Sequence, residues 1–159
     1  MKAVWLAKLI NAVIDRSLKR EPDFIIGGAA RPYMLRWFII GRNRFLNVYH
    51  HLIKRSDDDR ALHDHPWWSL SIVLDGSMLE VLSADRTVTR MLRQGDIVLR
   101  RASSAHRLEI RDGAFCKTLF ITGPRIREWG FHCPKGWKHW RDFVSKGDTG
   151  SVGPGCADE

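Results

Sequence analysis

Two histidines that lie two residues apart are the first residues whose types and spacing could do chemistry. His63 and His65 stand in the stretch HDHPWW. Alternate residues of a β-strand point to the same face, and Pro66 favours extended backbone at His65, so both rings are expected to project together. Neutral imidazoles held side by side are natural ligands for a divalent first-row metal ion. The alternative is that the pair is incidental to a strand.

His106 is the candidate for a third ligand. It follows a turn over residues 101–105 and a short strand over residues 97–100. Its distance along the chain suits a ligand that an antiparallel barrel returns to the same cavity. The sequence therefore predicts a site for a divalent transition metal at His63, His65 and His106. These ligands do not distinguish Fe, Ni, Zn, Mn and Co.

The same histidines lie in two motifs that resemble those of the cupin superfamily. His63, His65 and Gly76 match the first motif, and Gly95 and His106 match the second. The resemblance covers roughly residues 45–122. It implies a double-stranded β-helix, or jelly-roll barrel, with a metal ion bound inside by the three histidines. A longer pattern, SDDDRALHDHPWW with TLFITGPRIREWGF, resembles small uncharacterised cupin-like proteins of bacteria and phages and implies no known reaction.

The sequence departs from the cupin motifs at several positions. Ser69, or Leu70 with the longer motif spacing, stands where the first motif has a glutamate. Arg101, Ser103 and Ile110 replace the Pro, Gly and Asn of the second motif. The usual fourth ligand is thus missing from its usual place. An open three-histidine site has room for water and substrate, which suits catalysis. It equally suits a degenerate site that binds metal weakly.

Glu80 is the candidate for the missing carboxylate and is predicted to be catalytic. Asp75 and Gly76 favour a two-residue hairpin turn, which would pair Ser71 with Glu80 and turn the carboxylate toward the histidines. There it could be a general base, a fourth ligand, or an acceptor that orients a histidine. A three-residue turn would instead leave Glu80 in solvent.

Further residues are predicted to line a substrate pocket. Trp67 has the parity of His65 and should face the same side. Arg100, Arg101 and Arg107 lie near the second motif and could bind a substrate carboxylate or phosphate if they face inward. The predicted pocket residues are His51, Trp67, Ser69, Met78 and Arg101.

The elements that position these residues form an all-β domain. Residues 1–145 are predicted to be one domain, with an amphipathic helix over 1–20, a barrel over 34–122 and an aromatic extension over 123–145. The extension is expected to contain a short helix at 126–130. Residues 146–159 are small and polar and predict a disordered tail. The predicted strands are 34–40, 45–54, 67–74, 77–82, 87–93, 97–100, 106–111 and 115–122.

Composition limits the partners. The chain has 159 residues, a net charge of +8, seven Trp and seven Phe, so some aromatic side chains are expected to line a cavity or the interface of a homodimer. The basic residues are scattered, which argues against nucleic-acid binding. No stretch is apolar and long enough to span a membrane. The odd number of cysteines, without CxxC spacing, predicts no disulfide framework and a cytoplasmic protein.

Three functions are consistent with these observations. The first is a metal-dependent enzyme that acts on a small molecule, either dioxygenase-like or isomerase-like. The second is a non-catalytic module that binds a metal or small ligand, such as a sensor or a phage accessory protein. The third, a nucleic-acid binder, needs a clustering of basic residues that the sequence lacks.

Overall fold

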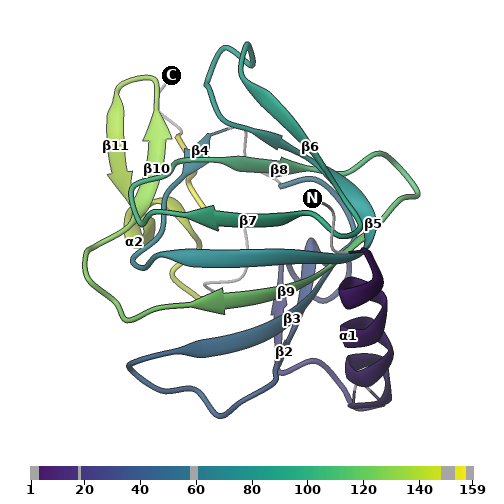
Figure 1. Ribbon diagram of the computed structural model, residues 1–159. Helices are drawn as coiled ribbons and strands as arrows, with labels where there is room; N and C mark the ends of the chain where they lie inside the picture. The colour runs from purple at the N-terminus through teal and green to yellow at the C-terminus, as the bar shows by residue number, and fades with distance from the viewer. Residues whose placement is uncertain (1–3, 18, 58–60, 148–152, 157–159) are drawn as a thin grey trace.

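A curled antiparallel sheet forms most of the computed structural model, which describes residues 4–17, 19–57, 61–147 and 153–156 (Figure 1). Within these residues the main sheet has eight strands, in the order β1-β2-β3-β9-β5-β6, with β7 and β8 also paired to β5. This architecture confirms the all-β prediction. The strands of the main sheet are β1 (Phe24–Ile26), β2 (Met34–Phe38), β3 (Asn47–Ile53), β5 (Ser69–Val81), β6 (Thr89–Arg93), β7 (Ile97–Arg100), β8 (Arg107–Glu109) and β9 (Cys116–Thr122).

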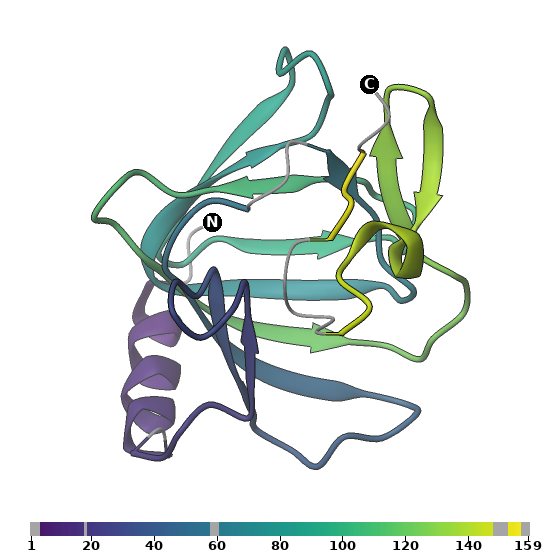
Figure 2. The ribbon, with the colours of Figure 1, turned by 180° about the vertical axis from the view of Figure 1, so that it is seen from behind.

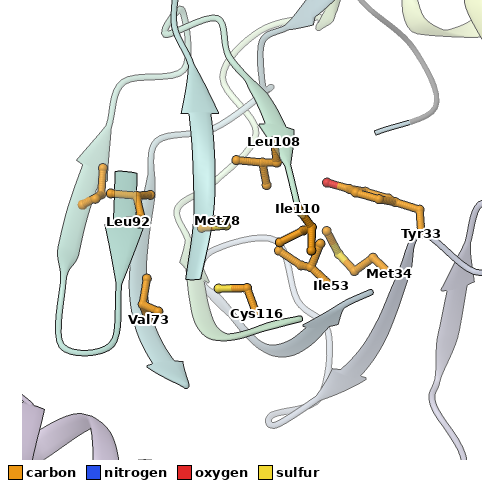
Figure 3. Close-up of a cluster of buried hydrophobic side chains, with 10 residues drawn as sticks. Tyr33, Met34, Ile53, Val73, Met78, Leu92, Leu108, Ile110 and Cys116 are labelled. Carbon is orange, nitrogen blue, oxygen red and sulfur yellow. The ribbon is translucent and has the colours of Figure 1, made fainter. Parts of the chain in front are cut away.

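The predicted N-terminal helix is present as α1 (Val4–Ser17). It packs on the outer face of β5, where Ala7 and Ile14 form a buried cluster with Ile72 and Leu74. A second cluster of buried side chains fills the inside of the curled sheet (Figure 3). It combines side chains of β2 and β3 with side chains of β5, β6, β7, β8 and β9. The two faces of β5 are therefore both covered, which explains why the successive residues from Ser71 to Leu74 are all buried.

The predicted hairpin at Asp75 and Gly76 is wrong, because β5 is one strand of 13 residues that continues through it. Gly76 has φ +72°, and the pairing of β5 with β9 shifts register between Val73 and Asp75. A Cβ atom on Gly76 would lie 2.1 Å from the carbonyl oxygen of Phe115. The glycine therefore serves a bulge and a close backbone approach rather than a turn.

The aromatic extension also differs from its prediction. Residues 126–130 form no helix; the extension instead contributes β10 (Gly130–Cys133) and β11 (Gly136–His139), followed by helix α2 (Trp140–Phe143). These two strands form a small sheet with β4 (Leu62–His63). A Cβ atom on Gly130 would lie 2.1 Å from the carbonyl oxygen of Lys138, so the tight pairing of β10 with β11 requires glycine there.

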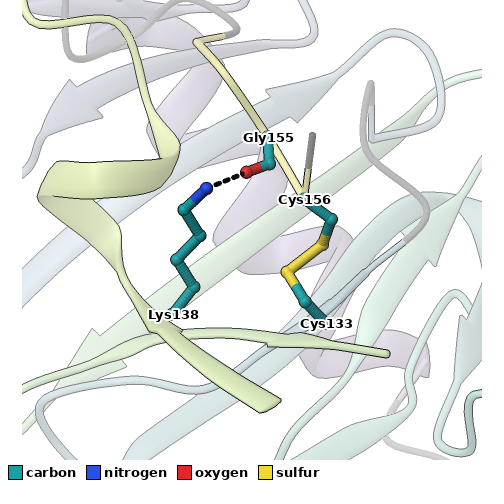
Figure 4. Close-up of a disulfide and its surroundings, with 4 residues drawn as sticks. All are labelled: Cys133, Lys138, Gly155 and Cys156. Carbon is teal, nitrogen blue, oxygen red and sulfur yellow. Dashed lines mark hydrogen bonds between the residues drawn. A yellow bond between two sulfur atoms is a disulfide. The ribbon is translucent and has the colours of Figure 1, made fainter. Parts of the chain in front are cut away.

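A disulfide between Cys133 and Cys156 corrects the prediction of no disulfide framework (Figure 4). The odd number of cysteines did not exclude a disulfide, because Cys116 is buried and free. Cys133 and Cys156 pair with each other, and their Cα atoms lie 5.6 Å apart. The tail is further held by two hydrogen bonds of Gly155, whose N–H donates to Phe143 at 3.0 Å and whose carbonyl accepts from Lys138 at 2.8 Å.

Part of the tail therefore has a defined place. Figure 2 shows residues 153–156 beside α2 and β10. The rest of the predicted disordered segment, 148–152 and 157–159, lies outside the described residues, as do 1–3 and 18 of the predicted helix. No helix among the described residues is long and apolar enough to cross a membrane. The single domain, the homodimer and the cytoplasmic location stay predictions.

Candidate metal centre

Backbone hydrogen bonds bring the three histidines together from two distant segments. The amide of His63 donates to the carbonyl of His106 at 2.9 Å, and the amide of His106 donates back to His63 at 2.9 Å. The amide of His65 donates to the carbonyl of Ala102 at 3.0 Å. The segment after β4 thus lies against the loop before β8, and alternation along the chain turns the rings of His63 and His65 toward that of His106.

The three rings converge on one point, as the sequence predicts. Their centroids lie 4.9–5.1 Å apart in each of the three pairs. One nitrogen from each ring lies within 4.8 Å of the other two, and the Nε2 atoms of His65 and His106 are 2.9 Å apart. This cluster could hold a metal ion.

The donor set fits a divalent first-row metal. When two imidazole nitrogens bind the same ion at 2.0–2.1 Å, with a right angle between the two bonds at the metal, they lie about 2.9 Å apart. The Nε2 atoms of His65 and His106 are separated by this distance. Burial lowers the pKa of His65 well below its ordinary value and lowers that of His106 to about 4, despite the hydrogen bond to Glu80. Both rings are therefore neutral near pH 7, the state that binds metal.

Glu80 lies behind His106 and is fully buried. Its Oε1 accepts from His106 Nδ1 at 2.6 Å and from Arg100 Nε at 2.6 Å, and its Oε2 accepts from Arg90 Nε at 3.0 Å. Burial alone would raise the pKa of Glu80, but the bonds from His106 and Arg100 outweigh it and hold the pKa well below its usual range. The ionised carboxylate accepts a hydrogen bond from Nδ1–H of His106, which leaves Nε2 with a free lone pair.

Glu80 faces inward, although the turn used to predict this does not exist. The bulge at Asp75 shifts the alternation of β5 by one residue. Odd-numbered residues before it, such as Ser71, and even-numbered residues after it, such as Met78 and Glu80, then share the interior. The hairpin and the bulge predict the same parity, and only the pairing partners differ: Glu80 lies opposite Arg90 and Leu108.

A cavity of about 440 Å³ opens beside the histidines. Of the predicted pocket residues, His51, Trp67 and Met78 line it, together with Trp129 and Phe131 of the extension. Ser69 is buried and Arg101 is exposed, and neither belongs to this lining as far as the described residues define it.

Comparison with known proteins bears on the fold. No protein-family model and no curated protein matches the sequence. Three similar solved structures are the polyketide cyclase RemF from Streptomyces resistomycificus, the DMSP lyase DddQ from Ruegeria pomeroyi DSS-3 and a cupin-like protein from Thermotoga maritima MSB8. RemF is 20% identical, over 82% of this chain and 84% of its own, with a TM-score of 0.56. DddQ is 17% identical, over 74% of this chain and 61% of its own, with a TM-score of 0.54. The Thermotoga protein is 13% identical, over 72% of this chain and 86% of its own, with a TM-score of 0.53. This chain has the cupin fold.

The cupin fold accounts for the convergence of the histidines but not for the whole site. At 13–20% identity the similarity establishes a shared architecture and no shared reaction. Ser69, at the position of the cupin-motif glutamate, is buried at the start of β5. The carboxylate nearest the histidines from β5 is instead that of Glu80, eleven positions further along the same strand.

Sequence reasoning missed several residues that position the site. Asp64, between the two histidines, is buried and anchors the extension: its carboxylate accepts from the Gly130 amide at 2.9 Å and from Trp137 Nε1 at 3.2 Å. Arg127 Nη1 lies 2.9 Å from the same carboxylate. Parity predicts that an acidic residue flanked by two inward histidines faces the opposite side, but it does not predict the partners that Asp64 meets there. Nothing local to Arg90 indicates that it reaches Glu80.

Proposed function

We propose that this cupin is a metal-dependent enzyme that acts on a small molecule, with His63, His65 and His106 as the metal ligands. The observation that carries the proposal is the convergence of three imidazoles, with nitrogens within 4.8 Å of one another, on the wall of a 440 Å³ cavity. A divalent ion with three protein ligands keeps positions for substrate and water, where it polarises a bound oxygen atom or lowers the pKa of water.

The protein's own residues have distinct parts in this proposal. His63, His65 and His106 hold the ion. Glu80 accepts a hydrogen bond from Nδ1–H of His106, so it orients that ring and acts as a positioning residue. Trp67 and Met78 supply apolar wall, and the aromatic side chains of the extension exclude water from the cavity.

The reaction class stays open between dioxygenase-like and isomerase-like chemistry. An imidazole-bound Fe, Ni, Zn, Mn or Co ion is compatible with both. The similar solved structures include a polyketide cyclase and a DMSP lyase, so comparable folds carry enzymes of different reaction classes. These activities belong to those proteins and do not choose a reaction for this one.

A non-catalytic metal-binding or ligand-binding module is the second candidate. One observation favours it: Glu80, the carboxylate bonded to the metal-site histidine, is enclosed by Arg90, Arg100 and His106. A carboxylate held ionised by three donors is a poor proton acceptor from a substrate. Under this alternative the same three histidines bind the metal, and the cavity binds a ligand without converting it.

Metal analysis of the purified protein tests the site. We expect about one transition-metal ion per chain, lost in His63→Ala and in His106→Ala, because each variant removes one of three ligands. His139→Ala is the matched control, since His139 is bonded to Glu128 on the extension. Full metal content in either ligand variant would contradict the assignment of that histidine, and absence of metal after reconstitution would contradict the site.

A further inference from the structure

A second polar group faces the cavity on the side opposite β5. Arg36 lies on β2, directly across from His51 on β3, and its Nε donates to His51 Nε2 at 2.9 Å. The guanidinium carbon lies 5.0 Å from the centroid of the Tyr49 ring. Arg36, Tyr49 and His51 all line the same cavity as the three histidines.

Arg36, Arg42 and Arg100 line the cavity, and Arg36 differs from the buried Arg100 in having no anionic partner. Arg100 also lines the cavity, but its charge is matched by Glu80 at 2.6 Å. Among the residues that the structure describes, no carboxylate pairs with Arg36, and its terminal NH2 groups have no protein acceptor. Burial lowers the pKa of Arg36 to about 10, so the group is still a cation near pH 7.

The neighbour of Arg36 does not compensate this charge. Burial, followed by the nearby Arg36 and His50, lowers the pKa of His51 well below its ordinary value. His51 is therefore a neutral acceptor that fixes the orientation of the guanidinium. Arg36 is half-buried, and a partly desolvated cation that lacks a counter-charge is stabilised when a ligand supplies one.

Arg36 and the histidines flank one shared space. Phe120 lies between them, with its ring centroid 5.1 Å from that of His51 and 6.3 Å from that of His65. The negative charge of Glu80 is already matched by Arg90 and Arg100. A divalent ion held by three neutral histidines would therefore keep its full charge, and together with Arg36 it would make the cavity strongly positive.

We propose that the substrate or ligand of this cavity is a small organic carboxylate, bound through its carboxylate to the free NH2 groups of Arg36 while the rest of the molecule reaches toward the histidines. The placement of the rest of the ligand near the three histidines rests on the proposed function. A single guanidinium presents two parallel N–H donors that match one carboxylate. A phosphate monoester carries about two negative charges and suits one arginine less well.

Benzoate is the probe for the test, with neutral benzamide and inorganic phosphate beside it, each titrated calorimetrically into metal-free and metal-loaded protein. We expect Arg36→Gln to weaken benzoate binding about tenfold or more in both forms, because a charged hydrogen-bond partner is lost. Benzamide binding should change little. Arg44→Gln is the matched control, since Arg44 is an exposed arginine that does not line the cavity.

Each outcome bears on the inference. Unchanged benzoate affinity in Arg36→Gln, no benzoate binding to the wild type at millimolar concentration, or an equal loss in Arg44→Gln would overturn it. Arg36-dependent binding of phosphate but not benzoate would overturn the carboxylate class. If Arg36→Gln does not fold, Arg36→Lys should also weaken binding, because an ammonium cannot present the paired donors; unchanged affinity would again overturn the inference. Arg36-dependent benzoate binding in a protein that binds no metal would refute the proposed function while the anion subsite stands.

Discussion

At the scale of single residues, the site combines three convergent imidazoles with one buried carboxylate, Glu80, whose oxygens are bonded to His106, Arg90 and Arg100. Alternation along an extended strand was sufficient to predict the convergence of His63 and His65, because it depends only on backbone geometry. The role of Glu80 could not be derived in the same way. It depends on Arg90 and Arg100, which other strands bring to the carboxylate.

Glu80→Gln tests the positioning role. The amide cannot balance the buried charge of Arg100, so we expect the free energy of unfolding to fall by about 3 kcal/mol in chemical denaturation. The same change should weaken metal binding about tenfold to a hundredfold, because His106 loses the acceptor that orients its ring. Glu128→Gln is the control, since Glu128 is 57% exposed in its side chain and pairs with Arg125. Unaltered metal affinity in a folded Glu80→Gln variant would contradict the role.

At the scale of elements, hydrophobic alternation located most of the barrel strands but not their connections. Ile97–Arg100 agrees with the prediction at both ends, and Cys116–Thr122 begins one residue later than expected. The Asp75-Gly76 pair has the composition of a hairpin turn, yet a glycine at positive φ serves a bulge equally well. The strands Gly130–Cys133 and Gly136–His139 were missed because both are short, and because the first also pairs with Leu62–His63, far away in the sequence.

The disulfide and α2 act together on the extension. The rings of Phe131 on β10 and Phe143 on α2 are stacked with centroids 3.5 Å apart, and both line the cavity. Cys133, at the end of β10, is bonded to Cys156 in the tail, which also contacts Phe143 through Gly155. The covalent link thus holds the tail against the elements that close the cavity.

Reduction of Cys133–Cys156 is expected to destabilise the protein. Closing a loop across a separation of 23 residues restricts the unfolded chain and contributes about 3 kcal/mol in the chain-entropy treatment. Urea unfolding of the wild type with and without dithiothreitol measures this difference. The double variant Cys133→Ser with Cys156→Ser should match the reduced wild type and should not respond to the reductant. Equal stability of the oxidised and reduced wild type would contradict a stabilising disulfide.

At the scale of the whole molecule, the fold buries more histidines than the candidate metal site needs. His50 and His51 are adjacent on β3 and both buried, His51 toward the cavity and His50 on the other face of the sheet, near Lys117 and Asp15. His50 has no hydrogen-bond partner for either ring nitrogen among the described residues. With a net charge of +8, further protonation adds repulsion as well as desolvation cost.

Acid should therefore destabilise the metal-free protein before its carboxylates titrate. Burial is the main cause, and Lys117 the second, that lowers the pKa of His50 from 6.5 to about 4. Between these two pH values the unfolded state binds a proton at His50 and the folded state does not. The contribution of His50 is complete above pH 6.5 and is lost as the pH falls toward 4, by about 3 kcal/mol at most. Denaturant unfolding across this range should show a shallower loss in His50→Leu than in the wild type, whereas above pH 7.5 the difference between the two proteins should be constant. A parallel loss in both proteins from pH 6.5 to 4 would mean that His50 is protonated in the fold, and the burial of a neutral ring beneath the sheet would not control the acid limit of stability.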